Sequence, residues 1–301
     1  MVEYLIRHTT NEDVDWLNER INYIIGKLKS KYVPKFREDI HSLAFSAIAN
    51  DILRFFYYSE YLKLKNISFS FLYYVNLFRL SSYKNDYQLM DKIFVDSFTH
   101  TGDPAKRSQK GDKLLDHHLF NYIQTSLVLR DREAIDFYAM LQPRNSIPGR
   151  YYFEHDQDFE QLLILLCNNE DEQSLMYLRS ITSKDYIQSL TNLPFQTAHL
   201  VPYLEFLFLP LIDVYLAILE KKEAKFNESL YKALSQHKTF YESEDEYKES
   251  RRGLPEGWVS LPLTAACVLA HQKGLKPEIE SDYIPEWLIK AEFDGLELII
   301  E

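Results

Sequence analysis

Apolar residues recur every three or four positions along most of the chain, which is the spacing that places side chains on one face of an α-helix. Residues 11–32 show the pattern clearly. The apolar positions in this stretch are Val14, Leu17, Ile21, Ile24, Ile25 and Leu28. Asn11 and Asp13 precede the stripe, and both are residue types that cap a helix N-terminus. The pattern therefore predicts a helix that begins near residue 13 and buries one face.

Later segments repeat this pattern and are joined by short linkers. The predicted helices cover residues 36–64, 68–83, 86–98, 114–131, 132–142, 158–169, 170–181, 184–193, 201–219, 224–241 and 257–273. The aromatic density of residues 68–83 also permits a strand there. Helices that follow one another through short linkers pack as antiparallel neighbours, so we expect an all-α fold built as a stack of antiparallel helical hairpins, similar to a helical-repeat protein. No repeat of fixed length aligns, and residues 291–301 are expected to form a short strand or an extended C-terminal tail.

One polar segment, residues 99–113, is the clearest interruption of the helical pattern. It carries two glycines, Gly102 and Gly111, and separates two blocks of predicted helices. This composition is typical of a connection between structural units. We therefore expect an N-terminal helical region over residues 1–98 and a C-terminal helical region over residues 114–301, the alternative being one continuous domain.

The charge balance narrows the classes of partner. Lys and Arg number 34 and Asp and Glu number 45, which gives a formal net charge of −11. An acidic protein repels phosphate backbones, so we expect no nucleic-acid binding and a partner that is basic. Glycine is scarce, with 8 residues, which disfavours glycine-rich phosphate loops and turn-dense β folds.

Residues 201–219 form the most apolar stretch of the chain. Because Glu205, Asp213 and two prolines interrupt it, we expect a central helix of a soluble protein and no membrane contact. The N-terminus lacks the basic and then apolar pattern of a signal peptide. Cys167 and Cys267 each lie in an apolar run and are expected to be buried free thiols. These features together predict a cytoplasmic protein.

Signatures of catalysis and of metal binding are weak. The histidine cluster Asp116, His117 and His118 places its two imidazoles on adjacent positions, which point about 100° apart on a helix and cannot easily share one ion. The sequence has no Gly-x-Ser-x-Gly, His-Glu-x-x-His or Cys-x-x-Cys motif, and residues 102–113 lack the Gly-Lys-Ser/Thr of a phosphate loop. We therefore expect no enzyme activity, no cofactor and no metal.

Two acidic runs, residues 154–160 and 242–249, remain as candidate interaction sites. The simpler interpretation is a solvated surface. The functional interpretation is a docking surface whose charge accelerates the approach of a basic partner and whose tyrosines provide aromatic contacts. The candidate binding residues are Glu154, Asp156, Asp158, Tyr241, Glu242, Glu244, Asp245 and Glu246.

The C-terminal part of the chain carries a family resemblance. Residues 251–289 combine the tripeptide RRG, the helix GWVSLPLTAACVLAHQKG and the turn IESDYIPEWLI. This arrangement resembles the C-terminal end of the immunity protein 49 family, whose members accompany toxins in bacterial polymorphic-toxin systems. The matching residues are Trp258, Ala265, Ala266, Ala270, Gly274, Glu280, Ser281, Asp282, Tyr283 and Pro285. The predicted hairpin of residues 114–139 also resembles the middle portion of that family.

The resemblance implies an all-α protein that binds and neutralises a cognate toxin without catalysis. The net charge favours a basic toxin, and nucleases with a basic substrate cleft are one such class. The alternative is a helical scaffold or regulatory protein that binds a peptide or protein partner in a groove. Immunity proteins of polymorphic DNase toxins have a similar Tyr-Pro ending, but the Asp-Asp pair that precedes it there is replaced here by HQKG.

The matching residues also have structural explanations. Small alanines allow a helix to approach its neighbours closely, and Gly274 can adopt the left-handed conformation that ends a helix. Pro285 suits the first turn of a following helix, which Ser281 or Asp282 could cap.

Overall fold

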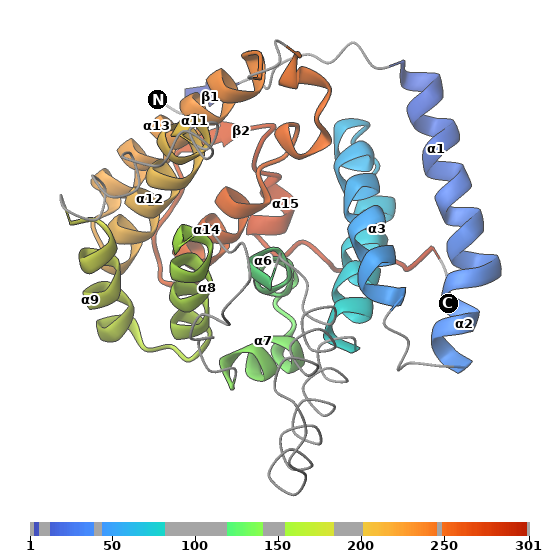
Figure 1. The fold of residues 1–301 in the computed structure, drawn as a ribbon, viewed down its shortest axis with the longest axis horizontal. Coiled ribbons are helices and arrows are strands. Elements are labelled where there is room, and N and C mark those ends of the chain that lie inside the picture. The colour runs from blue at the N-terminus through green and yellow to red at the C-terminus, as the bar shows by residue number, and fades with distance from the viewer. Residues whose placement is uncertain are drawn as a thin grey trace, which may run out of the picture.

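The computed structural model describes residues 3–5, 13–38, 44–81, 119–140, 154–183, 201–245 and 249–299 (Figure 1). Its elements in chain order are β1 (Glu3–Leu5), α1 (Val14–Lys27), η1 (Leu28–Tyr32), α2 (Val33–Glu38), α3 (Ala44–Tyr61), α6 (Leu119–Leu129), α7 (Arg132–Ala139), α8 (Glu154–Cys167), α9 (Asp171–Ile181), α11 (Val201–Tyr203), η3 (Leu204–Phe208), α12 (Leu209–Leu219), α13 (Glu223–Glu242), η4 (Arg251–Gly253), η5 (Pro255–Gly257), α14 (Leu261–Gln272), β2 (Ile279–Ser281) and α15 (Glu286–Ile289). Residues 65–81 are also helical, so the helix alternative was correct for that segment.

The all-α prediction is confirmed. Consecutive helices pack as pairs, namely α6 with α7, α8 with α9 and α12 with α13. Helix α14 crosses α6 and also contacts α12, so the last long helix joins the pairs (Figure 1). The predicted start of the first helix is confirmed as well, because the Asp13 side chain accepts a hydrogen bond from the backbone N–H of Asp15 at 2.8 Å.

Two hydrophobic clusters form the core. The larger cluster is drawn from the helices between α6 and α15. The other cluster combines α1, α3 and residues 65–78 with C-terminal residues from Trp258 to Leu288. Trp258 is completely buried there, with its ring 5.5 Å from that of Tyr58 and 4.9 Å from that of Tyr61. Both predicted regions therefore contribute to one core, whereas the predicted boundary at residues 99–113 lies outside the described residues.

Two short π-helical segments interrupt long helices, and each ends directly before an X-Pro pair. In η1 the backbone N–H of Val33 donates to the carbonyl of Leu28, one residue further back than in an α-helix, and Pro34 follows. In η3 the N–H of Leu209 donates to Leu204 in the same way, and Pro210 follows. Proline has no N–H and its ring crowds the preceding turn, so a widened turn lets each helix continue.

The second of these segments lies within the apolar stretch Val201–Leu219. Among the described residues this helical stretch is long and apolar enough to cross a membrane, by length and composition alone. Half of it is buried inside the protein, where α12 packs against α9, α13 and α14. That position in the larger cluster is the one expected of a core helix.

Among the described residues, β1 and β2 form a two-stranded parallel sheet that the sequence pattern did not predict. β1 pairs with β2 in the register Glu3 with Ile279 and Leu5 with Ser281. Residues 290–299 contain no helix or strand, and turns at residues 290–291 and 294–295 interrupt the predicted extended tail. The tail returns to the N-terminal helices, where the N–H of Ile299 donates to Ser70 at 3.0 Å.

Candidate functional site

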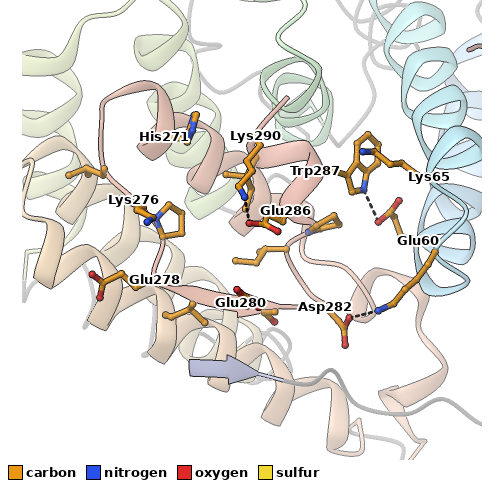
Figure 2. A pocket seen from close by; sticks show the side chains of 18 of the residues that line it. Glu60, Lys65, His271, Lys276, Glu278, Glu280, Asp282, Glu286, Trp287 and Lys290 are labelled. Carbon is orange, nitrogen blue, oxygen red and sulfur yellow. Dashed lines mark hydrogen bonds and ion pairs between the residues drawn. The ribbon is translucent and has the colours of Figure 1, made fainter. Parts of the chain in front are cut away.

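A cleft of about 1040 Å³ lies along the segment that follows α14 (Figure 2). One wall is the turn between α3 and the helix of residues 65–81, and the remainder is built by the stretch from α14 to α15. We call it the C-terminal cleft. Its lining residues include Glu60, Lys63, Lys65, His271, Lys276, Glu278, Glu280, Asp282, Pro285, Glu286, Trp287 and Lys290.

The backbone on this side of the cleft is fixed by a glycine and by buried contacts. Gly274 ends α14 with φ +82°, so the predicted left-handed stop is confirmed. The chain then runs through β2 to Tyr283, which is completely buried with its ring 4.9 Å from that of His237. The Tyr283 carbonyl accepts a hydrogen bond from the N–H of Ser260 at 2.7 Å. The acidic turn is therefore anchored at its base and presents its charged side chains outward.

The turn after α3 contacts this segment through side chains. Lys63, in the left-handed conformation with φ +57°, forms an ion pair with Asp282 at 3.1 Å. The indole N–H of Trp287 donates to the carboxylate of Glu60 at 3.3 Å, and the Lys65 ammonium lies 5.3 Å from the centre of the indole ring (Figure 2). These contacts hold the two walls of the cleft together across more than two hundred residues of sequence.

The predicted cap of α15 is wrong. Pro285 occupies the N-cap position itself and no side chain caps the helix. Ser281 instead accepts a hydrogen bond from the N–H of Tyr283 at 3.2 Å, and Asp282 pairs with Lys63.

The charges in the cleft are only partly neutralised. Lys290 forms an ion pair with Glu286, and the hydrogen bond that its ammonium donates to this carboxylate raises the pKa of Lys290. Glu278 and Glu280 are exposed, and neither carboxylate forms an ion pair with a described residue. Lys276 is an exposed cation of the same cleft, as are Lys63 and Lys290, which are paired with Asp282 and Glu286. The C-terminal cleft can therefore offer two accessible carboxylates next to apolar contacts from Pro285 and Trp287.

The first predicted acidic run begins α8. Glu154 and Asp156 fall on this helix, but their side chains lie outside the described part. Asp158 is half-buried and accepts a hydrogen bond from the hydroxyl of Tyr177 on α9. Its carboxylate therefore joins two packed helices, which is a structural role.

The second predicted run follows α13. Glu242 lies 4.0 Å from Lys238 one turn earlier, and the N–H of Glu249 donates to the Asp245 carboxylate at 2.7 Å. Glu244 pairs with Ser250 in an isolated antiparallel bridge. The described residues of this run therefore contact their own neighbours, whereas Glu246 and Tyr247 lie outside the described residues.

Tyr241 does not lie on this acidic surface, and its predicted exposure is wrong. It is 7% exposed, and its ring lies 4.7 Å from that of His237. Burial raises the pKa of its hydroxyl well above the ordinary value. Tyr241 falls on the face of α13 that also buries Phe226, Leu230 and Leu234, so the helical period determines its direction more strongly than the charged residues beside it.

The other chemical candidates give no site in the described residues. Within the part that the structure describes, no group of three or more His, Cys, Asp or Glu side chains could hold a metal ion. His117, His118, Tyr151 and Tyr152 lie outside the described residues. Cys167 and Cys267 are buried free thiols, as predicted.

The cleft was not predicted as a site, although its residues include part of the recognised segment. Helical periodicity indicates which face of α3 is buried, but Lys63 and Lys65 follow that helix in a turn. The hydrogen bond from Trp287 to Glu60 joins two residues that are 227 positions apart in the sequence. A pattern confined to neighbouring residues carries no information on such a contact.

The C-terminal cleft coincides with the end of a family match. The model of the family described as Immunity protein 49 matches residues 93–288, which include the segment from His271 to Leu288. No curated protein and no solved structure matches the chain. Because the family match covers well over half of the 301 residues, the chain belongs to the Immunity protein 49 family.

Proposed function

We propose that this protein neutralises a cognate toxin by forming a complex with it, without catalysis, and that the toxin docks at the C-terminal cleft. Membership of the immunity family supports the toxin as partner. We assign the toxin-docking site to the cleft because the end of the segment that matches the family forms one side of it. The cleft combines a backbone that is fixed by buried side chains with exposed charges that are only partly paired, and both features suit a surface that binds another protein.

The partner chemistry follows from the accessible charges. The cleft lysines Lys63, Lys65 and Lys290 are paired with Asp282, Glu292 and Glu286. Glu278 and Glu280 therefore present two carboxylates against one cleft lysine, Lys276, that forms no ion pair with a described residue. Trp287 lies between them and the wall formed by α3, and tryptophan is among the residues that contribute most to binding energy in interfaces. A toxin surface with basic side chains around an apolar centre fits this arrangement, and a nuclease with a basic substrate cleft is one such toxin.

The first experiment is toxicity rescue by co-expression. The product of the adjacent gene is expressed in a bacterium with and without this protein, and the two are then co-purified. Growth arrest that this protein relieves, together with co-elution, is the expected result. A toxic neighbour that this protein neither rescues nor binds would contradict the proposed function.

Two matched charge reversals test the location. Glu278→Lys with Glu280→Lys changes the cleft, and Glu242→Lys with Glu244→Lys applies the same charge change to the predicted acidic turn. We expect the cleft variant to lose at least ten-fold in affinity because charged contacts in interfaces contribute roughly 1–3 kcal/mol or more. The turn variant should retain rescue. The opposite result would place the interface on the acidic run after α13, and unchanged binding in both variants would exclude both surfaces.

A groove that binds a peptide is the second candidate function. Trp287 and Pro285 would then provide the binding energy, and the accessible carboxylates would matter little. Trp287→Ala should abolish binding in that case, whereas Glu278→Lys with Glu280→Lys should leave it intact. A docking surface for a basic toxin should be sensitive to both changes.

A further inference from the structure

The N-terminal helices carry a charge opposite to that of the whole protein. Residues 20–37 contain six basic side chains and no acidic one, whereas the rest of the chain has 28 basic and 45 acidic side chains. The basic residues are Arg20, Lys27, Lys29, Lys31, Lys35 and Arg37. We call this surface, on α1, η1 and α2, the basic ridge. It lies outside residues 93–288, so the family match does not account for it.

Aromatic side chains alternate with these cations on one face of α1. At 100° per residue, Trp16, Arg20, Tyr23 and Lys27 lie within about 60° of one another. Leu17, Ile21 and Ile24 lie about 100° around the helix from this face and are buried. Trp16 is 36% exposed and Tyr23 is 57% exposed, so both rings remain at the surface although the helix is packed.

Each ring holds a cation in place. The Arg20 guanidinium lies 5.1 Å from the centre of the Trp16 ring, and the Lys27 ammonium lies 5.2 Å from that of Tyr23. Among the described residues, none of the six ridge cations forms an ion pair. A hydrogen bond with Tyr23 raises the pKa of Lys27, so this ammonium remains charged. Arg20 and Lys27 therefore pack against aromatic rings and remain available to an anionic partner.

We propose that the basic ridge docks this protein on a membrane surface that carries anionic lipid headgroups. Residues 20–37 span about 27 Å along the helix axis, and α1 forms one edge of the molecule (Figure 1). A long edge can lie flat on a planar surface. Lys and Arg attract anionic headgroups, and Trp and Tyr prefer the interfacial layer. The exposed face has no wide apolar stripe, so the docking is peripheral and does not insert the helix.

Nucleic acid is the competing polyanion, and the rings argue against it. Single-stranded binding depends on aromatic faces that are free to stack on bases. Here Arg20 and Lys27 already lie over the faces of Trp16 and Tyr23. The expectation of no membrane contact came from the charges and prolines that interrupt residues 201–219, which argue against a membrane-spanning helix and do not bear on peripheral docking.

Vesicle flotation tests the proposal on the full chain. The probes are vesicles of phosphatidylglycerol in phosphatidylcholine and vesicles of phosphatidylcholine alone. We expect binding only to the anionic vesicles, and release by 1 M salt because the Debye length then falls to about 3 Å. Equal binding to neutral vesicles, or no binding to anionic ones at low salt, would overturn the proposal.

Matched variants locate the contact. Arg20→Gln, Lys27→Gln and Lys31→Gln together should weaken binding to anionic vesicles about 100-fold, since each cation near the surface contributes roughly a factor of five. The control changes three exposed cations elsewhere, Lys221→Gln, Lys232→Gln and Arg252→Gln, and should bind like the native protein. All six positions are at the surface or half-buried, and circular dichroism checks the fold. Equal losses in both variants, or tighter binding to a single-stranded DNA oligonucleotide than to the vesicles, would also overturn the proposal.

Discussion

Gly257 lies directly against the ring of Tyr241. A methyl group at Gly257 would come within 2.9 Å of Tyr241 Cε1 and closer still to two other ring carbons. The Gly257 carbonyl is also 3.1 Å from Nε2 of His237. The absence of a side chain at position 257 is therefore what allows the end of α13 to pack against the residues that lead into α14.

Gly257→Ala should lower the free energy of unfolding by about 1–3 kcal/mol, the usual cost of overpacking a core. The change should cost much less in a Tyr241→Ala background, where the clashing ring is absent. A double-mutant cycle by urea denaturation measures the difference.

Gly26→Ala is the matched control for this cycle. Gly26 lies within α1, and an added methyl group would meet nothing within 4 Å. The substitution should stabilise the protein by about 0.5–1 kcal/mol, because alanine loses less conformational entropy than glycine in a helix. If Gly257→Ala behaved like Gly26→Ala, the close contact with Tyr241 would be refuted.

The two cysteines should be unreactive in the folded protein. Burial raises the pKa of Cys167 to about 12, and that of Cys267 also rises because its thiol is completely buried. A shift of this size reduces the thiolate fraction of Cys167 near pH 8 roughly 1000-fold, and the thiolate is the reactive species. Ellman's reagent should titrate both thiols in urea and neither before unfolding. Rapid stoichiometric labelling of the native protein would contradict this result.

Features that depend on neighbouring residues were predictable from the sequence. The period of apolar residues located the helix pairs, Asp13 was one of two candidate caps, and Gly274 was the predicted left-handed stop. Each of these depends on side chains and dihedral angles within about one or two helical turns. The fold class followed because short linkers restrict consecutive helices to antiparallel packing.

Features that depend on distant residues were not predictable in this way. Strand β1 is three residues long and forms because it pairs with β2. The paired residues Glu3 and Ile279 are 276 positions apart in the sequence. The cleft requires the turn at Lys63 to meet Asp282. Tyr241 was assigned to the surface because acidic residues follow it, although the helical period of α13 directs it inward.

Acid should destabilise the protein partly through Glu220. A hydrogen bond from Lys222 is the main factor that lowers the pKa of Glu220 to about 2, with a further hydrogen bond from Arg179. The folded-state pKa lies below the ordinary value of 4.5, so the stabilisation is present above that pH and is lost as the pH falls from 4.5 towards 2. Glu220→Gln should flatten the dependence of the urea midpoint on pH in this window.

Glu228→Gln is the control for that measurement. Glu228 is exposed on α13 and forms no ion pair with a described residue. The control should keep the steep native loss of stability below pH 4.5. Identical pH profiles for the native protein and Glu220→Gln would show that the carboxylate of Glu220 does not contribute to acid sensitivity. High salt should narrow the difference, because the interacting cations are largely exposed.

Arg130 should be the residue on which the position of α15 depends most. It lies in the turn between α6 and α7 with φ +56°, and its guanidinium donates to the carbonyls of Leu288 at 2.9 Å and Ile289 at 2.6 Å. Arg130→Met keeps most of the apolar stem but leaves both carbonyls without this donor. We expect a loss of roughly 2–4 kcal/mol in the free energy of unfolding, because hydrogen bonds to charged groups contribute about 1.5–3 kcal/mol each.

Arg130→Lys separates the effect of charge from that of geometry. Lysine retains the charge and the same backbone strain, but its single ammonium cannot reproduce the two-pronged contact with both carbonyls. It should therefore recover less than half of the lost stability.

Hydrogen exchange adds a local measurement, since the amides of α15 should exchange faster in both variants while those of α12 and α13 keep the protection of the larger cluster. Because α15 carries Glu286 and Trp287, the same variants should weaken toxin binding if the cleft is the docking site. Native stability and native protection of α15 in Arg130→Met would mean that the tail and the buried side chains of Leu288 and Ile289 fix this helix without the arginine.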